Sequence, residues 1–258
     1  MNTTGGEDAD GTVFENPREF WEHDIGEEKD KWYRGAVSYW DSQENSDNGV
    51  LGGYGVLCGP DIKGSKDFLR KVAAVSPRIK EILSGEAVDE TRAFDGGAGV
   101  GRVTEKLLLK YFSRVDLVEP SKQLLDTAEE RLRGDALSNP EHNSADQFYC
   151  VGLQDFHPKP NTYDCAWLQW CLMYLTDDDI GAFLQTCKAA LKPGGVAVVK
   201  ENTARTGFVV DRDDNSISRT AEYMKDLFHR AGFKLIAEST QRNWPKDLYM
   251  VKMYAFTA

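Results

Sequence analysis

The chain has 258 residues, with 42 Asp or Glu against 31 Lys or Arg, and therefore a net charge of −11 at neutral pH. This acidic balance repels phosphate groups and argues against a broad nucleic-acid-binding face. Hydrophobic residues make up 41% of the chain, which is enough for a buried core and excludes wholesale disorder.

The sequence shows no membrane, disulfide or metal signature. No apolar run reaches the roughly 20 residues that a membrane helix needs, and the first ten residues lack the features of a secretory signal. We therefore expect a cytoplasmic protein without a membrane anchor, and the sequence leaves residence in the nucleus open. The five cysteines form no CxxC pair and the four histidines are scattered, so neither a disulfide framework nor a metal site is predicted.

The first thirty residues contain ten acids and two bases, and thus eight of the eleven net negative charges. This composition predicts a flexible, solvated extension at 1–30, followed by one domain at 31–258. Aromatic residues between Glu15 and Trp40 predict helices that cap a core. Within the domain, residues 31–90 are predicted to form this helical cap and a substrate-channel segment.

The predicted core of the domain is residues 91–258. Residues 61–83, before this core, are predicted to form a helix or a helix pair, with a break at Pro77. Strands that alternate with helices predict a parallel sheet, with strands at 91–95, 115–119, 147–151, 163–168 and 196–200. Two further strands, 234–239 and 249–256, are too close for a crossover helix and should form an antiparallel hairpin at the sheet edge. The expected fold is α/β and Rossmann-like, with seven mostly parallel strands.

A glycine-rich turn follows the first strand, which ends at Asp95. Glycines at 97, 99 and 101 allow a tight backbone turn at the carboxyl end of the strand, where open α/β sheets bind ligands. The spacing is G-x-G-x-G rather than the G-x-G-x-x-G of dinucleotide-binding folds, which weakens a nicotinamide interpretation.

An acidic residue and a loop after the third strand are expected at the same carboxyl ends of the strands as the glycine turn. Glu119 ends the second strand, where a carboxylate can accept hydrogen bonds from both ribose hydroxyls of an adenosine ligand, and Leu153 and Gln154 follow the third strand. Together with the glycine turn they suit S-adenosylmethionine, with Asp95 facing its ammonium group and Arg102 its carboxylate. The alternative is a tight strand-to-helix turn with ordinary solvated acids.

The remaining candidates for contact with a ligand are one aromatic side chain and a segment that contains three aspartates. Trp170 ends the fourth strand, and its ring either packs or stabilises a cation by about 0.5 to 2 kcal/mol. Residues 209–218 are predicted to form a loop that contains Asp211, Asp213 and Asp214. Either the loop is simply solvated, or Asp211 and Asp214 hold a protonated amine and one of them takes its proton. An α-amine, with a pKa of about 7.7 to 8.0, needs less help than a lysine amine at about 10.4.

The sequence lacks the motifs that are typical of methyltransferases acting on some other acceptors. No NPPY-type or DPPF-type tetrapeptide follows the fourth strand, which argues against adenine-N6 and glutamine-amide methylation. None of the five cysteines has a proline neighbour, as cytosine-C5 chemistry would require. Amines and other small polar nucleophiles remain.

The chain resembles the α-N-terminal protein methyltransferases in DGGAGVGRVT at 95–104, LGGYG at 51–55, GLQDF at 152–156, WLQW at 167–170, KEN at 200–202 and DRDDNS at 211–216. The resemblance covers about residues 30–258 and leaves the acidic extension outside. Members of this family transfer methyl groups from S-adenosylmethionine to the free α-amine of proteins that begin X-Pro-Lys or X-Pro-Arg.

The resemblance implies a role for individual residues. It implies that Asn202 binds the first substrate residue, while Asp211 and Asp214 flank the α-amine and the third-position Lys or Arg. The implied cofactor contacts, to which we add Asp95 and Gly99, are Gly97, Arg102, Glu119, Leu153, Gln154 and Gln169. The residues implied to line the peptide channel are Tyr39, Trp40, Leu51, Trp170, Ser216 and Tyr249.

Two positions depart from the family pattern. Glu119 stands where the family has Asp, which keeps the carboxylate, and Tyr174 stands where the family often has His. A tyrosine, with a pKa of about 10, is a poor base at neutral pH, so the proton-accepting role falls on Asp214.

Two alternative functions remain open. They are a small-molecule N- or O-methyltransferase of the same fold, with an enclosed pocket, and a catalytically weak S-adenosylmethionine-binding regulatory protein. We expect a monomer.

Overall fold

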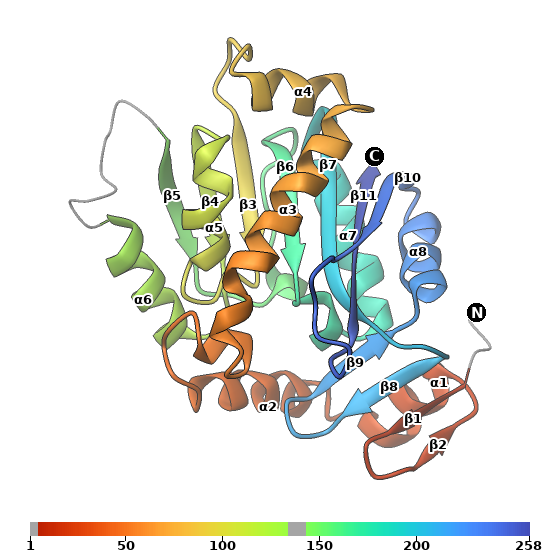
Figure 1. The fold of residues 1–258 in the computed structure, drawn as a ribbon. Helices are drawn as coiled ribbons and strands as arrows, with labels where there is room; N and C mark the ends of the chain where they lie inside the picture. Colours follow the sequence, from red (N-terminus) through yellow and green to blue (C-terminus); the bar gives the residue numbers. More distant parts are fainter. Residues whose placement is uncertain (1–4, 134–142) are drawn as a thin grey trace.

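The computed structural model describes residues 5–133 and 143–258 and centres on a parallel sheet (Figure 1). Neighbouring parallel strands follow the order β5-β4-β3-β6-β7. Their bounds are β3 Arg92–Gly96, β4 Arg114–Val118, β5 Ser144–Tyr149, β6 Tyr163–Gln169 and β7 Leu191–Thr203. The predicted α/β fold with five alternating strands is thereby confirmed.

The predicted antiparallel hairpin is also present. Strand β10 (Lys234–Thr240) pairs with β11 (Met250–Thr257), and β11 continues the sheet antiparallel to β7. The expected number of seven strands is too low, however, because the described residues form an eleven-stranded sheet. The four additional strands are β1 Gly6–Asp8, β2 Val13–Phe14, β8 Phe208–Asp211 and β9 Ser216–Arg219.

Two of these strands correct the prediction of a loop at 209–218. Strands β8 and β9 form an antiparallel hairpin, with Asp211 opposite Ser216. Asn215 closes the turn in the left-handed region, with φ of 56°, a conformation that Asn tolerates better than most residues. The hairpin joins the main sheet through the pairing of Thr203 with Arg219.

For the described residues from 5 onward, the other two strands replace the solvated extension that was predicted at 1–30 with a packed segment. Strand β1 pairs in parallel with β8, and β2 pairs with β1. Phe14 and Phe20 are buried and contact the ring of Phe208, with centroids 6.2 and 6.4 Å from it. The acids of residues 5–30 determine the charge of this segment. Its aromatic side chains pack into a hydrophobic cluster, and this burial determines how the segment folds.

Helices cover both faces of the sheet (Figure 1). The longer ones are α2 Lys29–Asp41, α3 Cys58–Ala73, α4 Pro77–Ser84, α6 Lys122–Arg133, α7 Asp177–Ala190 and α8 Ala221–Arg230. The shorter ones are α1 Pro17–Glu19, the π-helix η1 Phe20–Ile25, α5 Arg102–Lys106, and the 3₁₀ turns η2 Gly49–Leu51, η3 Gly55–Leu57, η4 Leu108–Lys110, η5 Leu153–Asp155 and η6 Leu172–Tyr174. The break predicted at Pro77 is confirmed, since Pro77 is the first residue of α4 and the Ser76 side chain caps it.

The core has two main parts, one on each face of the sheet. On one face, Leu69 of α3 and Ile79 of α4 pack with Trp167 of β6, and all three are buried. On the other face, Phe183 of α7 and Phe228 of α8 belong to a cluster that also receives the N-terminal aromatic side chains. The result is a three-layer arrangement of helices, sheet and helices.

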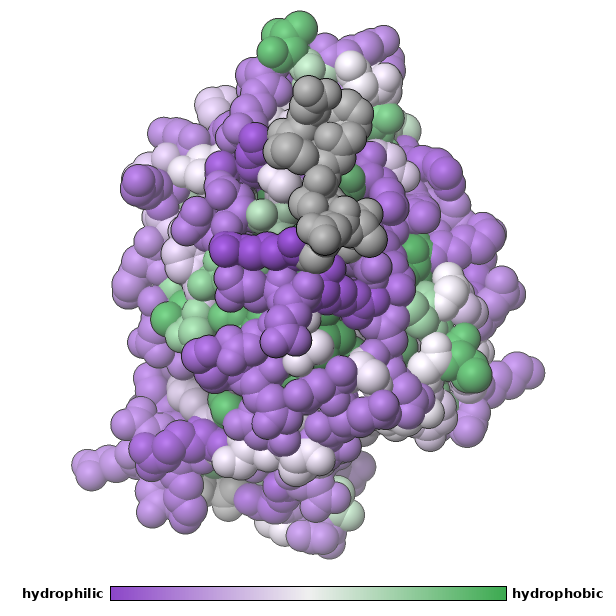
Figure 2. Space-filling view, turned by 90° about the vertical axis from the view of Figure 1, so that its left-hand side faces the viewer, coloured by the Kyte–Doolittle hydropathy of each residue, from purple (hydrophilic) through white to green (hydrophobic). Residues whose placement is uncertain are grey.

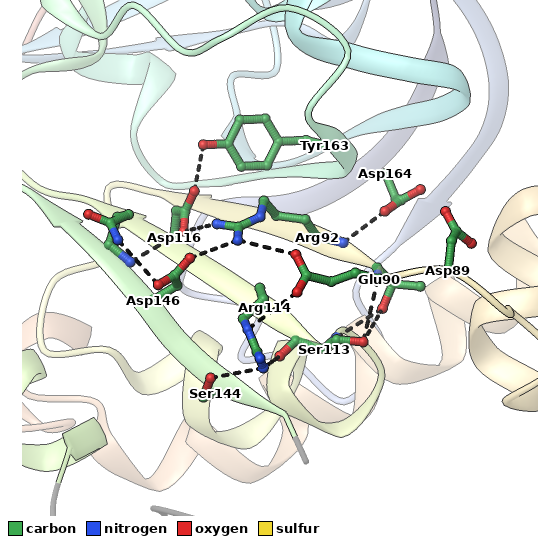
Figure 3. Close-up of polar contacts among 12 residues, drawn as sticks. Asp89, Glu90, Arg92, Ser113, Arg114, Asp116, Ser144, Asp146, Tyr163 and Asp164 are labelled. Atoms are coloured by element: carbon green, nitrogen blue, oxygen red, sulfur yellow. Dashed lines mark hydrogen bonds and ion pairs between the residues drawn. The ribbon is translucent and has the colours of Figure 1, made fainter. Parts of the chain in front are cut away.

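An ion-pair network aligns the amino ends of the parallel strands (Figure 3). Arg92 at the start of β3 lies 2.8 Å from Asp116 of β4 and 2.7 Å from Asp146 of β5. The Tyr163 hydroxyl of β6 donates to Asp116 at 2.7 Å, and the carboxylate of Asp164 accepts from the backbone N–H of Arg92. These contacts lie at the edge opposite the glycine turn and hold four strands in register.

The outer surface near β5 and α6 is mostly hydrophilic, and its hydrophobic residues occur in small separate groups (Figure 2). In the part of the chain that the structure describes, no helix is long and apolar enough to cross a membrane.

Candidate active site

A cavity of about 630 Å³ lies at the carboxyl ends of the parallel strands. Its wall combines the glycine turn after β3, the end of β6, helix α2 and the 244–249 segment. Asp211 and Ser216 are the two predicted site residues that do not line it. The predicted residues that line it are Tyr39, Trp40, Leu51, Asp95, Gly97, Gly99, Arg102, Glu119, Leu153, Gln154, Gln169, Trp170, Tyr174, Asn202, Asp214 and Tyr249.

The glycine turn brings the backbone to the cavity wall. Gly97, Gly99 and Gly101 all have positive φ, at 67°, 52° and 74°. A Cβ at Gly97 would lie 2.5 Å from the Cβ of Cys171, closer than two carbon atoms can pack. Glycine at 97 therefore permits both the positive φ of the turn and the close contact with the end of β6. The lack of a side chain also leaves room for a ligand against the main chain.

Glu119 presents a buried carboxylate beside this turn. One oxygen accepts from the backbone N–H of Gly99 and the other from that of Ser121, both at 2.9 Å. Burial raises the pKa of Glu119 to about 7. Each carboxylate oxygen has a second lone pair, so the group can still accept two hydroxyl donors from a ligand in the cavity.

A buried polar cluster stands behind the cavity wall. Asp61 of α3 lies 2.7 Å from Arg102 and 2.5 Å from the Nζ of Lys200, and it accepts from Gln169 at 3.0 Å. Burial alone would raise the pKa of Asp61, but the two cations hold this pKa below its ordinary value. Two cationic side chains thus share one carboxylate, and this arrangement favours an anionic ligand group next to Arg102.

Asp95 lies deep in the same region. It is 1% exposed, accepts from the Thr104 hydroxyl at 2.7 Å, and has its pKa raised to about 6 by burial. A cationic ligand group beside Asp95 would stabilise its ionised form.

The open end of the cavity is built around Trp170. This residue has φ of 53° and turns the chain out of β6, while the carboxylate of Glu201 accepts from the next two backbone N–H groups at 2.9 Å. The indole N–H donates to the Oδ1 of Asn202 at 3.2 Å, and the ring lies against Trp244 with centroids 6.1 Å apart. The turn is thus fixed by a buried carboxylate, and both tryptophans face the cavity.

Tyr174 and Asp214 form a hydrogen-bonded pair at this end. The indole N–H of Trp40 donates to the Tyr174 hydroxyl at 2.9 Å, and the hydroxyl donates to the Oδ2 of Asp214 at 3.4 Å. Burial raises the pKa of Tyr174 well above 10, so it stays protonated. Burial also raises the pKa of Asp214. The neighbouring Ser216 and Tyr174 oppose this effect, and the charge of Asp211 adds to it. The Oδ1 of Asp214 is buried and has no hydrogen-bond partner among the described residues.

Asp211 and Ser216 take other places. Asp211 is exposed at the end of β8 and accepts from the backbone N–H of Asp213 at 2.9 Å. Besides burial, the charges of Asp214 and Asp211 raise the pKa of Tyr39 and of Tyr249, two residues of the cavity wall, so Asp211 lies near the mouth of the cavity rather than in its wall. Ser216 is 3% exposed and packs at the start of β9, outside the wall.

Several residues of the site were missed by the sequence analysis. Asp61 shares a helix face with Ser65, Leu69 and Val72, all buried, and an acid on the apolar face of an amphipathic helix was a signal that could have been used. Lys200 at the end of an apolar strand was a similar signal. Trp244 and Leu248 belong to the β10–β11 connection, and no local pattern connects them with a cavity.

Comparisons with known proteins agree with this geometry. Residues 28–257 match the family model described as AdoMet-dependent proline di-methyltransferase. An α-N-terminal protein methyltransferase 1 of Arabidopsis thaliana is 44% identical over 98% of this chain and 90% of its own. An N-terminal Xaa-Pro-Lys N-methyltransferase 1 of Danio rerio is 38% identical over 89% of this chain and 96% of its own.

A solved structure extends the agreement to three dimensions. A SAM-dependent methyltransferase of Leishmania major superposes with a TM-score of 0.86 at 33% identity, covering 100% of this chain and 97% of its own. The likeness therefore includes the N-terminal segment as well as the sheet. The chain belongs to the family of AdoMet-dependent proline di-methyltransferases.

Proposed function

We propose that this protein transfers methyl groups from S-adenosylmethionine to the free α-amine of proteins that begin X-Pro-Lys or X-Pro-Arg. The observation that carries the proposal is that one cavity joins the region around Glu119 to an open end at Trp170, where Asp214 lines the wall and its Oδ1 has no hydrogen-bond partner among the described residues. The printed names of the relatives in Arabidopsis thaliana and Danio rerio, together with the family description, support the same reaction.

The residues at the inner end fit the cofactor. The glycine turn gives close approach to the main chain, Glu119 can accept both ribose hydroxyls, and Arg102 can pair with the carboxylate of the amino-acid part. Leu153 and Gln154 of the neighbouring turn complete this wall. When bound, S-adenosylmethionine supplies a methyl group on a positively charged sulfur.

The residues at the open end fit a proline-containing, basic N-terminus. Trp170 offers a flat face to the second-position proline, and Asn202 offers its amide to the first residue of the substrate. The exposed Asp211 at the mouth can pair with a Lys or Arg at the third position.

Asp214 is proposed to accept the proton that the α-amine must lose before it can attack. Its unpartnered oxygen and raised pKa suit a general base, and Tyr174 holds its other oxygen without competing for the proton. Attack in line with the carbon–sulfur bond then depends mainly on position, which Trp170 and Asn202 fix.

The rival reading, a small-molecule methyltransferase, calls for an enclosed pocket. Tyr54 and Tyr249 both line the cavity, and their exposed fractions are 46% and 44%. The cavity thus reaches the surface between exposed aromatic side chains, which favours a chain end as the acceptor.

The proposed acceptor can be tested with four synthetic hexapeptides and labelled S-adenosylmethionine. Peptides that begin Ser-Pro-Lys and Ala-Pro-Lys should be methylated, whereas an N-acetylated copy and a copy with Ala for Pro should not. Methylation of the acetylated copy at the same rate would rule out the α-amine.

Glu119 gives a prediction for the pH dependence of cofactor binding. Its carboxyl must be ionised to accept two hydroxyl donors, and its pKa before binding is about 7. The dissociation constant for S-adenosylhomocysteine should therefore fall as the pH rises towards about 7 and level off above it. Titration calorimetry at several pH values measures this. In Glu119→Gln the affinity should be lower and the part of the pH dependence near 7 lost, which leaves the part near 6 that Asp95 contributes. An unchanged profile would contradict the assignment.

A further inference from the structure

We propose that Asp8, in the acidic N-terminal segment, is a positioning residue that acts through Arg212 to hold the turn carrying Asp214 at the cavity. This inference rests on the proposed function for the role of Asp214. Asp8 lies before residue 28, where the match to the family model begins.

The turn between β8 and β9 needs support from outside the main sheet. Its hairpin joins β7 through the single pair of Thr203 with Arg219. On its other side, β1 pairs with β8 at three positions, and the backbone N–H of Ala9 donates to the carbonyl of Val210 at 3.1 Å. The N-terminal segment therefore forms one complete side of the hairpin.

The carboxylate of Asp8 is positioned to pair with a cation. Its carboxylate is buried, with 1% of the side chain exposed. One oxygen accepts from the backbone N–H groups of Asp10 and Thr12, at 3.1 and 2.8 Å, which fixes the carboxylate in the β1–β2 turn. The other oxygen lies 2.8 Å from the Nε of Arg212. A buried carboxylate fixed by main-chain donors is a rigid partner for a guanidinium group.

Asp214 lies between two tethers. Arg212, two residues before it, is held by Asp8. Asn215, one residue after it, donates from its side-chain amide to the carbonyl of Trp32 at 2.9 Å. Both tethers come from the first forty residues of the chain. Because Asp214 has to face the cavity from an exposed turn, release of either tether should let its carboxylate move away from the acceptor amine.

The test uses the full chain and compares Asp8→Asn with Asp10→Asn. Asparagine at 8 keeps the size of the side chain and an oxygen for the backbone donors, but it loses the charge that holds Arg212. Asp10 is exposed in the same turn, so its substitution removes an equal charge and serves as the control. Asp8→Asn should lower kcat for an Ala-Pro-Lys peptide about tenfold with the KM for S-adenosylmethionine unchanged, whereas Asp10→Asn should leave both unchanged.

A double-mutant cycle separates positioning from general loss of stability. If Asp8 acts through Arg212, Arg212→Gln should cause a similar loss of kcat, and the double variant should lose no more than either single variant. Additive losses, or equal kcat values in Asp8→Asn and Asp10→Asn, would overturn the proposal.

Hydrogen exchange gives a readout that does not depend on the peptide reaction. With S-adenosylhomocysteine bound, backbone amides of residues 211–216 should exchange faster in Asp8→Asn than in Asp10→Asn or the unaltered protein. Equal exchange in all three would refute the tether itself. If the unaltered protein methylates no peptide, the proposed function fails, while the exchange result still decides whether Asp8 holds the turn.

Discussion

Asp214→Asn is expected to lower the turnover of an X-Pro-Lys peptide at neutral pH by about 100-fold or more. The substitution keeps the shape of the side chain and an oxygen to accept from the Tyr174 hydroxyl, but the amide cannot take a proton from the substrate amine. Asp214 lines the open end of the cavity, and its buried Oδ1 has no hydrogen-bond partner among the described residues. The loss should therefore appear in kcat, with little change in the affinity for S-adenosylhomocysteine.

Asp213→Asn is the matched control for this variant. Asp213 carries the same charge in the same turn, but it is exposed and does not line the cavity. Its substitution should leave kcat within about twofold, because an exposed charge acts weakly through solvent. Rates measured under saturating peptide and cofactor check both variants. Near-normal turnover in Asp214→Asn, or equal losses in the two variants, would assign the base elsewhere.

Asp61→Asn is expected to reduce the free energy of unfolding by about 3 to 5 kcal/mol, as removal of one member of a buried ion-pair cluster does. The carboxylate of Asp61 is shared by Arg102 and Lys200, and the side chain of Lys200 is fully buried. Without Asp61 both cations stay buried with no counter-charge at that point. Urea unfolding monitored by tryptophan fluorescence measures the change.

Asp67→Asn provides the comparison within the same helix. Asp67 of α3 pairs with Lys63 and Arg70 at the surface, where all three side chains are at least half exposed. Such pairs contribute about 0 to 1 kcal/mol, so this variant should differ little from the unaltered protein. Asp61→Asn should in addition bind S-adenosylhomocysteine more weakly, because Arg102 and Gln169 lose the partner that orients them. A small change in unfolding free energy would show that the cluster does not depend on Asp61.

The alternating strands of the core could be predicted because each is a short apolar segment next to a helical one. The C-terminal hairpin was equally clear from its short connection. The β8–β9 hairpin was missed because aspartates at 211, 213 and 214 dominate its composition, whereas Val210 and Ile217, both buried, show its strand character. Strands β1 and β2 were missed for the same reason, because acids are frequent there and Phe14 is the one large buried side chain that they carry, whereas the aromatic residues from Glu15 onward did predict helices that cap a core.

The candidate site divides in a similar way. The glycine turn and Glu119 follow from local sequence at strand ends. Trp170, Asp211 and Asp214 were candidates from the residues alone, whereas the rest of the peptide end followed only from the family resemblance. Asp61 and Lys200 lie 139 residues apart and meet only in the folded protein, where the Asp61 carbonyl also accepts from Lys200 at 3.0 Å. Likewise, the contact between Asp8 and Arg212 depends on β1 joining β8. Such contacts are decided by tertiary packing, which no local pattern records.

The central claim is that the methyl group is transferred to the α-nitrogen of the substrate, and its most direct test is the position of the methyl group in the product. An Ala-Pro-Lys peptide incubated with the protein and S-adenosylmethionine can be fragmented by tandem mass spectrometry. We predict that the mass increase lies entirely on the first residue and that Asp214→Asn yields almost none of this product. A mass increase on the lysine side chain, or none with the unaltered protein, would contradict the claim.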